Sequence, residues 1–363
     1  MRRTLYASCA GLTLLVAAGC DSPNTLPTAA DLAPLSAKPT SPPSDISIVV
    51  LPQIGGGPSE AYAINDAEEI AGTSGSFAAR WIRSSPTWSV QQLGTATGSA
   101  TDINEAGTAV GSSGGTIFLW RRDGTSEAVG LGSAKALDEA ETIVVGRSAS
   151  GFLTAWVRVG GVWTPHVLPR SPGVTGGTHE PGGINDDGII VGYSADAGNV
   201  QHAVKWVPST VNPGEWDPPV PIDAFAGSSN SFATAIEGDD IAGGAFRCNP
   251  PTASCPARDP RHWSLSGAST IGSLGTGDAW AEGLNASRFI VGVFFVQDRG
   301  KSVNTAFVWS PAAPTIQDLG KPKGQSEAWA YDINNSTASR TAKQIVGYVG
   351  NNAGHSAAVW TLQ

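Results

Sequence analysis

Two tryptophans that depart from a repeated sequence pattern are the residues best suited to bind a ligand. Trp280 and Trp329 each lie five residues before an asparagine, Asn285 and Asn334 respectively. Ionisable residues lie at or next to the corresponding position of this and other copies of the pattern, namely Glu60, His179, Glu180, Asp278 and Glu327. Aromatic faces stack on sugar rings and attract cations, and carboxylates accept hydrogen bonds. We predict a binding site for a glycan or a cationic ligand. The alternative is that both indoles are partly buried against neighbouring loops.

The same acids offer a second chemistry, the cleavage of glycans. Glu60, Glu180, Asp278 or Glu327 would act as acid and base of a hydrolase or lyase, in which the two carboxyl groups lie about 5 Å apart for retention and farther apart for inversion. The sequence has no nucleophile elbow, no phosphate-binding Gly-Lys loop and no His-Glu zinc helix. We therefore expect a binding protein rather than an enzyme, with no catalytic residue and no cofactor, and keep the hydrolase or lyase as the alternative.

Two cysteines, Cys248 and Cys255, enclose Asn-Pro-Pro-Thr-Ala-Ser in a long insertion. In an exported protein such a pair typically forms a disulfide. Zinc would need more ligands than the one histidine that follows, His262. Calcium would need the alternating acids and closing glutamate of a calcium loop, which the acidic turns lack. We predict a disulfide and no metal site.

A pattern that occurs seven times positions these residues. Each copy runs from a small residue through an apolar residue, an asparagine or its substitute, a turn and an apolar pair to a glycine and then a tryptophan. The glycines are Gly72, Gly111, Gly146, Gly192, Gly243, Gly292 and Gly347, and the tryptophans are Trp81, Trp120, Trp156, Trp206, Trp263, Trp309 and Trp360. In the copy Asn185-Asp186-Asp187-Gly188, asparagine suits the first position of a type I turn and glycine the fourth. The short β-branched segments on either side predict strands.

Four short strands in each of seven copies predict an all-β fold, a seven-bladed β-propeller of four-stranded blades. A β-solenoid is the alternative, although rungs of near-constant length tolerate the varying loop lengths less well. The last copy lacks its final Leu-Gly strand, and residues 46–55 resemble that strand. We expect this N-terminal segment to complete the last blade and close the ring, which would remove exposed sheet edges.

The pattern resembles the HAF family of extracellular repeats, named for a His-Ala-Phe triplet before the tryptophan. The resemblance covers roughly residues 46–363 and rests on the order Ile-Asn, Val-Gly, Trp and Leu-Gly. The triplet itself is degenerate, because the nearest matches are His-Ala-Val at residues 202–204 and Thr-Ala-Phe at residues 305–307. The family has no assigned biochemical activity, so the resemblance implies an extracellular repeat fold and no particular chemistry.

The N-terminus predicts export. Arg2 and Arg3 precede an apolar stretch at residues 12–18, which is too short to span a bilayer. The stretch leads into Leu-Val-Ala-Ala-Gly-Cys, ending at Cys20. This ending resembles the lipobox of bacterial lipoproteins, which implies that residues 1–19 are removed and that Cys20 is acylated. The alternative is a soluble secreted protein that is cleaved nearby.

Residues 20–45 are rich in proline and small polar residues, so we expect a disordered tether between the lipidated Cys20 and the globular region 46–363. The formal charge of −9 opposes binding to a phosphate backbone, and we expect no nucleic-acid partner.

The predicted protein is a monomer in the bacterial cell envelope, held to a membrane only through its lipid on the periplasmic face or the cell surface. Its predicted function is that of a binding scaffold for a glycan or protein, because loops on a rigid scaffold commonly carry binding. A purely structural surface protein is a further alternative.

Overall fold

The computed structural model describes residues 46–172, 174, 178–198, 200–222, 230–246, 258–264, 267–271, 278–298, 301–335, 342–351 and 354–362. The predicted signal peptide, Cys20, the predicted tether and the cysteine pair Cys248 and Cys255 lie outside these residues. The chain divides into the units Met1–Leu35 and Ser36–Gln363, and every described residue belongs to the second. Across the described ranges all regular structure is β, and no helix of the length and apolarity needed to cross a bilayer occurs.

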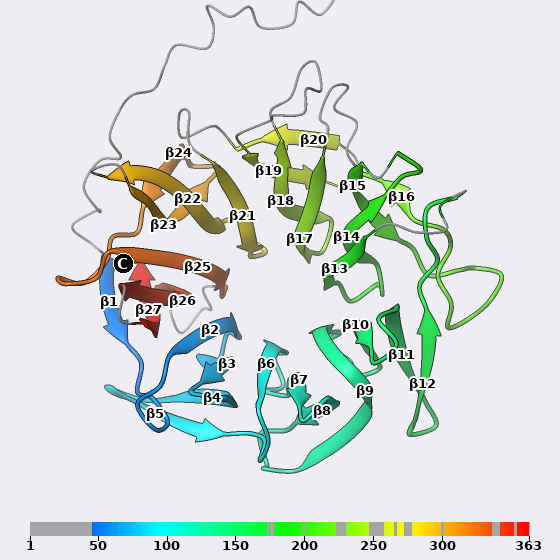
Figure 1. Ribbon diagram of the computed structural model, residues 1–363, viewed down its shortest axis with the longest axis horizontal. Coiled ribbons are helices and arrows are strands. Elements are labelled where there is room, and N and C mark those ends of the chain that lie inside the picture. Colours follow the sequence, from blue (N-terminus) through cyan, green and yellow to red (C-terminus); the bar gives the residue numbers. More distant parts are fainter. Residues whose placement is uncertain are drawn as a thin grey trace, which may run out of the picture. The chain divides into compact units, whose positions relative to one another are not determined.

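The described strands form small antiparallel sheets, five of four strands and one of seven (Figure 1). The four-stranded sheets, in hydrogen-bonding order, are β2 (Ser59–Ile64), β3 (Glu69–Ser74), β4 (Phe77–Ser84), β5 (Thr87–Gln92); β13 (His179–Ile184), β14 (Ile190–Ala195), β15 (Gln201–Trp206), β16 (Val220–Pro221); β17 (Ser231–Glu237), β18 (Asp240–Phe246), β19 (Arg258–Ser264), β20 (Gly267–Thr270); β21 (Ala279–Leu284), β22 (Ile290–Asp298), β23 (Lys301–Ser310), β24 (Ala313–Asp318); and β1 (Ile46–Val50), β27 (Gly354–Leu362), β26 (Lys343–Asn351), β25 (Glu327–Ile333). The seven-stranded sheet is β12 (Val162–Val167), β11 (Leu153–Val159), β10 (Ile143–Ser148), β9 (Ser126–Leu137), β8 (Thr116–Trp120), β7 (Ala109–Ser113), β6 (Gly98–Ile103).

Strand β9 is long because it serves two neighbours. Residues 126–131 pair with β8, and residues 132–137 pair with β10. Gly132 lies at the junction with φ +142°, and a Cβ there would lie 2.1 Å from the carbonyl oxygen of Arg147. Only glycine therefore allows the strand to pass from one set of strands to the next without strain.

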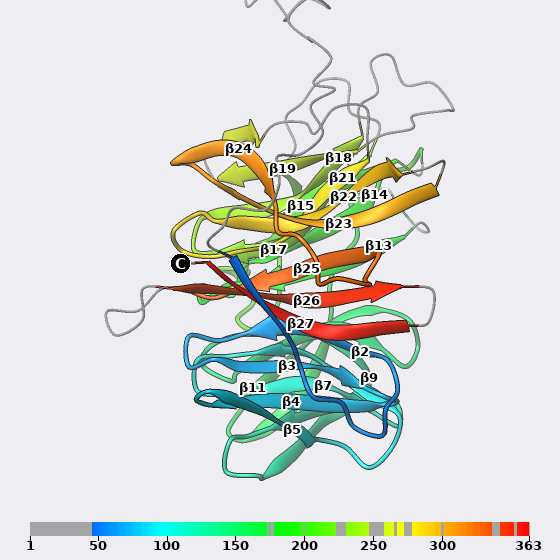
Figure 2. The same ribbon diagram turned by 90° about the vertical axis from the view of Figure 1, so that its left-hand side faces the viewer.

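The two ends of the described chain meet in one sheet. Strand β1 pairs with β27, in a register that runs from Ile46 opposite Leu362 to Val50 opposite Ala358. Figure 2 shows β1 in blue beside the red C-terminal strands. The N-terminal segment therefore lies along the last strand of the final copy, which has no Leu-Gly strand of its own.

Seven inner strands share one irregularity. They are β2, β6, β9, β13, β17, β21 and β25, which are the innermost strands of their sheets in Figure 1. Each contacts the next along the chain, and β25 contacts β2. Each also carries a β-bulge that leaves one residue out of the ladder, three positions before the turn residue of its repeat. These bulge residues are Tyr62, Thr101, Lys135, Gly182, Thr234, Glu282 and Tyr331. A bulge re-aims a side chain, and all seven line one central cavity.

The repeat tryptophans form the packing between sheets. All are at most 6% exposed except Trp309, which is partly buried. The indole N–H of Trp81 donates to the carbonyl oxygen of Pro52 at 2.7 Å, and that of Trp206 donates to Pro169 at 2.8 Å. Each indole thus holds the segment that arrives from the preceding sheet.

The turn asparagines connect neighbouring sheets at the end of the inner strands. The Asn285 Oδ1 atom accepts the N–H of Phe289 at 3.0 Å, which closes its own turn. Its Nδ2 donates to the carbonyl oxygen of Asn334 in the next turn at 2.9 Å. Asn65, Asn104, Asn185 and Asn334 make the same pair of contacts. One amide therefore shapes a turn and joins it to its neighbour.

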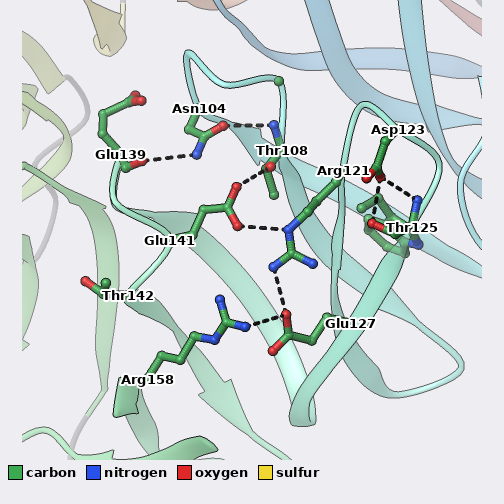
Figure 3. A network of polar contacts seen from close by, with 12 residues as sticks. Asn104, Thr108, Arg121, Asp123, Thr125, Glu127, Glu139, Glu141, Thr142 and Arg158 are labelled. Atoms are coloured by element: carbon green, nitrogen blue, oxygen red, sulfur yellow. Dashed lines mark hydrogen bonds and ion pairs between the residues drawn. The ribbon is translucent and has the colours of Figure 1, made fainter. Parts of the chain in front are cut away.

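A network of charged groups joins two neighbouring sets of strands farther from the cavity (Figure 3). Arg121 pairs with Glu127 at 2.7 Å and with Glu141 at 3.0 Å, and Arg158 also pairs with Glu127, at 3.1 Å. All these side chains are partly buried and share partners, so they contribute more than isolated surface pairs do.

We predict that Asn285→Asp lowers the free energy of unfolding by about 1–3 kcal/mol, because the carboxylate keeps the acceptor but loses the donor to the Asn334 carbonyl. Urea unfolding measures the change. Asn212→Asp makes the same chemical change at an exposed turn and is the control. Equal effects in the two variants would contradict a joining role for the turn asparagine.

Candidate functional site

Five aromatic side chains from two neighbouring sheets form an aromatic cluster beside the inner strands: Trp280, Phe295, Trp329, Tyr331 and Tyr348. The rings of Trp280 and Trp329 lie 5.2 Å apart at an interplanar angle of 70°. Phe295 lies 5.2 Å from Trp280, and Tyr348 lies 6.2 Å from Trp329. The two predicted tryptophans are therefore in contact although they are 49 positions apart in the chain. Four of the five side chains are only partly buried, and Tyr348 is buried.

A carboxylate that the sequence analysis did not identify holds both indoles. Glu282 Oε1 accepts the N–H of Trp280 at 2.7 Å and that of Trp329 at 3.2 Å. Burial raises the pKa of the Glu282 carboxyl, while the indole donors and the charge of Lys135 favour its ionised form. Glu282 is the bulge residue of β21, so it connects the aromatic cluster to the cavity.

The Asp278 carboxylate contacts the aromatic cluster through an arginine, Arg258. The guanidinium of Arg258 forms two hydrogen bonds with the Asp278 carboxylate, at 2.6 and 2.9 Å. The same guanidinium carbon lies 3.7 Å from the centre of the Trp280 ring. Asp278 therefore places a cation on one face of Trp280, and that face is occupied in this structure.

Glu60 and Glu327 meet on either side of a histidine. His355 Nδ1 lies 2.9 Å from Glu60 Oε1, and His355 Nε2 lies 3.3 Å from Glu327 Oε1. The imidazole stacks on Tyr348 with ring centres 4.0 Å apart. Tyr331 donates its hydroxyl to Glu60 Oε2 at 3.2 Å. The two acids come from β2 and β25, and the histidine joins them to the aromatic cluster.

His179 and Glu180 make their contacts elsewhere, with Arg147. Glu180 forms an ion pair with Arg147, which also donates to the carbonyl oxygen of His179 at 2.6 Å. The His179 side chain is buried, and burial together with Arg170 and Arg147 lowers its pKa to about 4. Of the seven predicted site residues, the structure thus brings five together and leaves these two apart.

The central cavity has a volume of about 200 Å³ and is lined by residues from all seven inner strands. The seven bulge residues form one layer of the cavity wall, the bulge layer. Next to it lie two desolvated carboxyl groups, Asp102 and Asp332. Asp102 Oδ2 accepts the N–H of Leu137 at 2.9 Å, and Asp332 Oδ2 accepts the N–H of Ile64 at 2.9 Å. Each of these acids therefore joins its inner strand to the next one.

Among the described residues, no group of three or more His, Cys, Asp or Glu side chains is arranged to hold a metal ion.

Comparison with known proteins concerns the fold alone. No protein-family model matches the chain, and no curated protein matches its sequence. The structure is similar to that of the RRP9 WD40 repeats, with a TM-score of 0.53 and 11% identity over 90% of this chain and 100% of that one. It is also similar to the extracellular domain of a putative hybrid two-component system from B. thetaiotaomicron, with a TM-score of 0.51 and 11% identity over 85% of this chain and 39% of that one. A Trypanosoma rangeli sialidase gives a TM-score of 0.42 at 11% identity over 89% of this chain and 59% of that one. The WD40 likeness supports a β-propeller fold.

We predict that stability falls as pH rises from about 4 to about 7. Burial raises the pKa of Asp332 to about 7, against the N–H bonds from Ile64 and Ile333 that lower it. The folded protein therefore holds this proton more tightly than the unfolded chain, whose aspartates titrate near pH 4. The contribution of Asp332 to stability is therefore complete below about pH 4 and is lost as the pH rises to about 7.

The melting temperature, measured at about pH 5 and at about pH 8, tests this effect. Asp332→Asn should narrow the difference in melting temperature between those two values, while Glu215→Gln on an exposed turn should leave it as in the original chain. An unchanged pH dependence in Asp332→Asn would exclude this carboxyl as a cause.

Proposed function

We propose that the described residues form a seven-bladed propeller whose last blade is completed by β1. When β9 is divided at Gly132, the seven-stranded sheet becomes two four-stranded sets that share this strand. Together with the five four-stranded sheets, these two sets make seven blades. The cyclic contacts of the inner strands and the pairing of β1 with β27 support closure. Antiparallel pairing of strands that follow each other in the chain differs from the stacked rungs of a solenoid.

We further propose that the chain is an extracytoplasmic lipoprotein of the HAF-repeat type, tethered through Cys20. The lipobox-like ending at Cys20 and the proline-rich residues that follow support this proposal. Stable anchoring requires more than one acyl chain or a second membrane signal, and bacterial lipoprotein acylation provides several chains.

The proposed function is the binding of a glycan at the aromatic cluster. The observation that carries it is the gathering of partly exposed aromatic rings around one carboxylate, at positions where the repeat is broken. Residues that recur in every copy, such as the tryptophans from Trp81 to Trp360, serve packing, and all of these tryptophans are buried except the partly buried Trp309. At the position of Trp280 and Trp329 the other copies have Glu, Ser or, once, Phe232, so packing of the repeat does not require a tryptophan there.

The geometry favours binding over glycoside cleavage. Each of the four acids considered for catalysis contacts a basic side chain: Asp278 contacts Arg258, Glu180 contacts Arg147, and Glu60 and Glu327 contact His355. None of these acids is among the residues that line the central cavity. An acid and a base flanking a bound sugar would need a different arrangement.

A glycan array tests the proposed function, with the mature chain carrying Cys20→Ser so that no lipid interferes. We expect binding to at least one glycan, and a loss of about tenfold or more in both Trp280→Ala and Trp329→Ala. Trp88→Ala removes a partly buried indole on β5, outside the aromatic cluster, and should leave binding intact. Glycan binding that survives both cluster variants would contradict the proposal.

Metabolic labelling with a radioactive fatty acid tests the tether. The chain should incorporate label and sediment with membranes, and Cys20→Ser should do neither. Label that persists in Cys20→Ser, or an unlabelled chain in the soluble fraction, would overturn the lipoprotein proposal.

A further inference from the structure

The bulge layer of the central cavity contains one side chain of each charge. Lys135 extends from β9 and Glu282 from β21, and both line the cavity. Figure 1 shows β9 and β21 on opposite sides of the centre. Burial raises the pKa of the Glu282 carboxyl, and the charge of Lys135 acts in the opposite direction, toward the ionised form. The two opposite charges therefore face the same small space.

Lys135 is not in direct contact with a charged partner, although its charge acts on Asp102 and Glu282. Within the described part of the chain its ammonium makes no hydrogen bond and no ion pair, and the residue is exposed to the cavity. Glu282 Oε1 is fixed by the two indole donors, which orient the carboxylate. One charge is thus positioned by the protein and the other is available to a ligand.

The other bulge residues add no charge. Thr101 and Thr234 donate their hydroxyls to main-chain oxygens of the following sheet, Ala134 at 3.3 Å and Ala281 at 2.9 Å. Gly182 has no side chain, and a Cβ there would lie 2.3 Å from the Ala233 carbonyl oxygen. These three positions serve contacts between sheets and leave the cavity to the remaining side chains.

Two tyrosines complete the wall next to Glu282. The rings of Tyr62 and Tyr331 lie 5.2 Å apart at 64°. Burial and the nearby Glu60 carboxylate raise the pKa of Tyr62 to about 12, so this ring stays neutral at physiological pH. Neutral aromatic faces beside a carboxylate favour a cationic group.

The surrounding acids exclude a simple anion. Asp102 and Asp332 lie one layer away, and Asp66, Glu105, Glu139 and Glu237 also line the cavity toward the turns. A ligand that carried only negative charge would be repelled by those of these acids that are ionised, and a ligand that carried only positive charge would place no anion beside Lys135.

We propose that this cavity binds a small zwitterion, an amino-acid-like molecule whose carboxylate pairs with Lys135 and whose ammonium pairs with Glu282 beside the tyrosine rings. The site goes beyond the glycan function, with which it shares only Glu282. The oriented Glu282, the unpartnered Lys135 across the cavity and the aromatic faces carry the proposal together.

Calorimetric titration of the mature Cys20→Ser chain tests it. The probes are glycine, β-alanine, γ-aminobutyrate and trimethylglycine, whose opposite charges differ in spacing and methylation, with propionate and propylamine as single-charge analogues. At least one zwitterion should bind with a Kd of about 10 mM or lower, and the Kd of both single-charge analogues should be at least about tenfold higher.

Two variants locate the site. Lys135→Met and Glu282→Gln should each weaken the best zwitterion by about tenfold or more, and glutamine keeps an oxygen for the two indole donors. Lys323→Met removes the same charge from an exposed position and is the control. Near-ultraviolet circular dichroism confirms that each variant is folded.

No saturation by any zwitterion at about 10 mM, equal binding of a single-charge analogue, or an unaffected Lys135→Met variant would each overturn the proposal. Lys135→Met leaves the aromatic cluster intact, so glycan binding measured on this variant shows whether the two functions fail separately.

Discussion

The structure depends on the two-sided hydrogen bonding of the turn asparagine. Its oxygen closes the turn of one inner strand, and its amide nitrogen binds the turn of the next, as at Asn185, whose Nδ2 donates to the Gly238 carbonyl oxygen at 2.9 Å. Aspartate at position 138 accepts the N–H groups of Thr142 and Ile143 but has no donor for the following turn. The amide therefore does what no carboxylate can, because it fixes both the shape and the spacing of neighbouring inner strands.

That fixed spacing gives the β-bulge its functional meaning. Ladder residues on either side of the bulge, such as Ala61 and Ala281, are fully buried and pack between sheets. The bulge residue leaves the ladder and faces the cavity, so packing constrains its identity least. Tyrosine, threonine, lysine, glycine and glutamate all occur there. The repeat therefore builds the scaffold, and one position in each copy decides what the cavity offers to a ligand.

The scaffold could be predicted from the sequence because its pattern is repeated. The site could be predicted only in part, because it depends on contacts between residues far apart in the chain. The strands around Asn185 and Gly188 and the burial of Trp206 follow from local pattern and recurrence. Trp280 and Trp329 stood out because they break that recurrence. Glu282 was missed because a bulge shifts side-chain alternation by one residue, although its place three residues before Asn285 was a signal. His355 and Arg258 were missed because their partners, Glu60 and Asp278, come from other strands.

The two desolvated aspartates lie where the asparagine contacts are longest. Asn104 reaches the next turn at 3.4 Å and Asn334 at 3.5 Å, whereas Asn285 and Asn185 both do so at 2.9 Å. Next to the two long contacts, Asp102 and Asp332 each add a 2.9 Å hydrogen bond from the following inner strand. Alanine or glycine occupies this position in the other copies, as at Gly183 and Gly283. Burial of a carboxyl group costs solvation, and two main-chain N–H donors to each aspartate offset that cost. The carboxyl groups thus reinforce two weak contacts between inner strands, one of which joins β25 to β2.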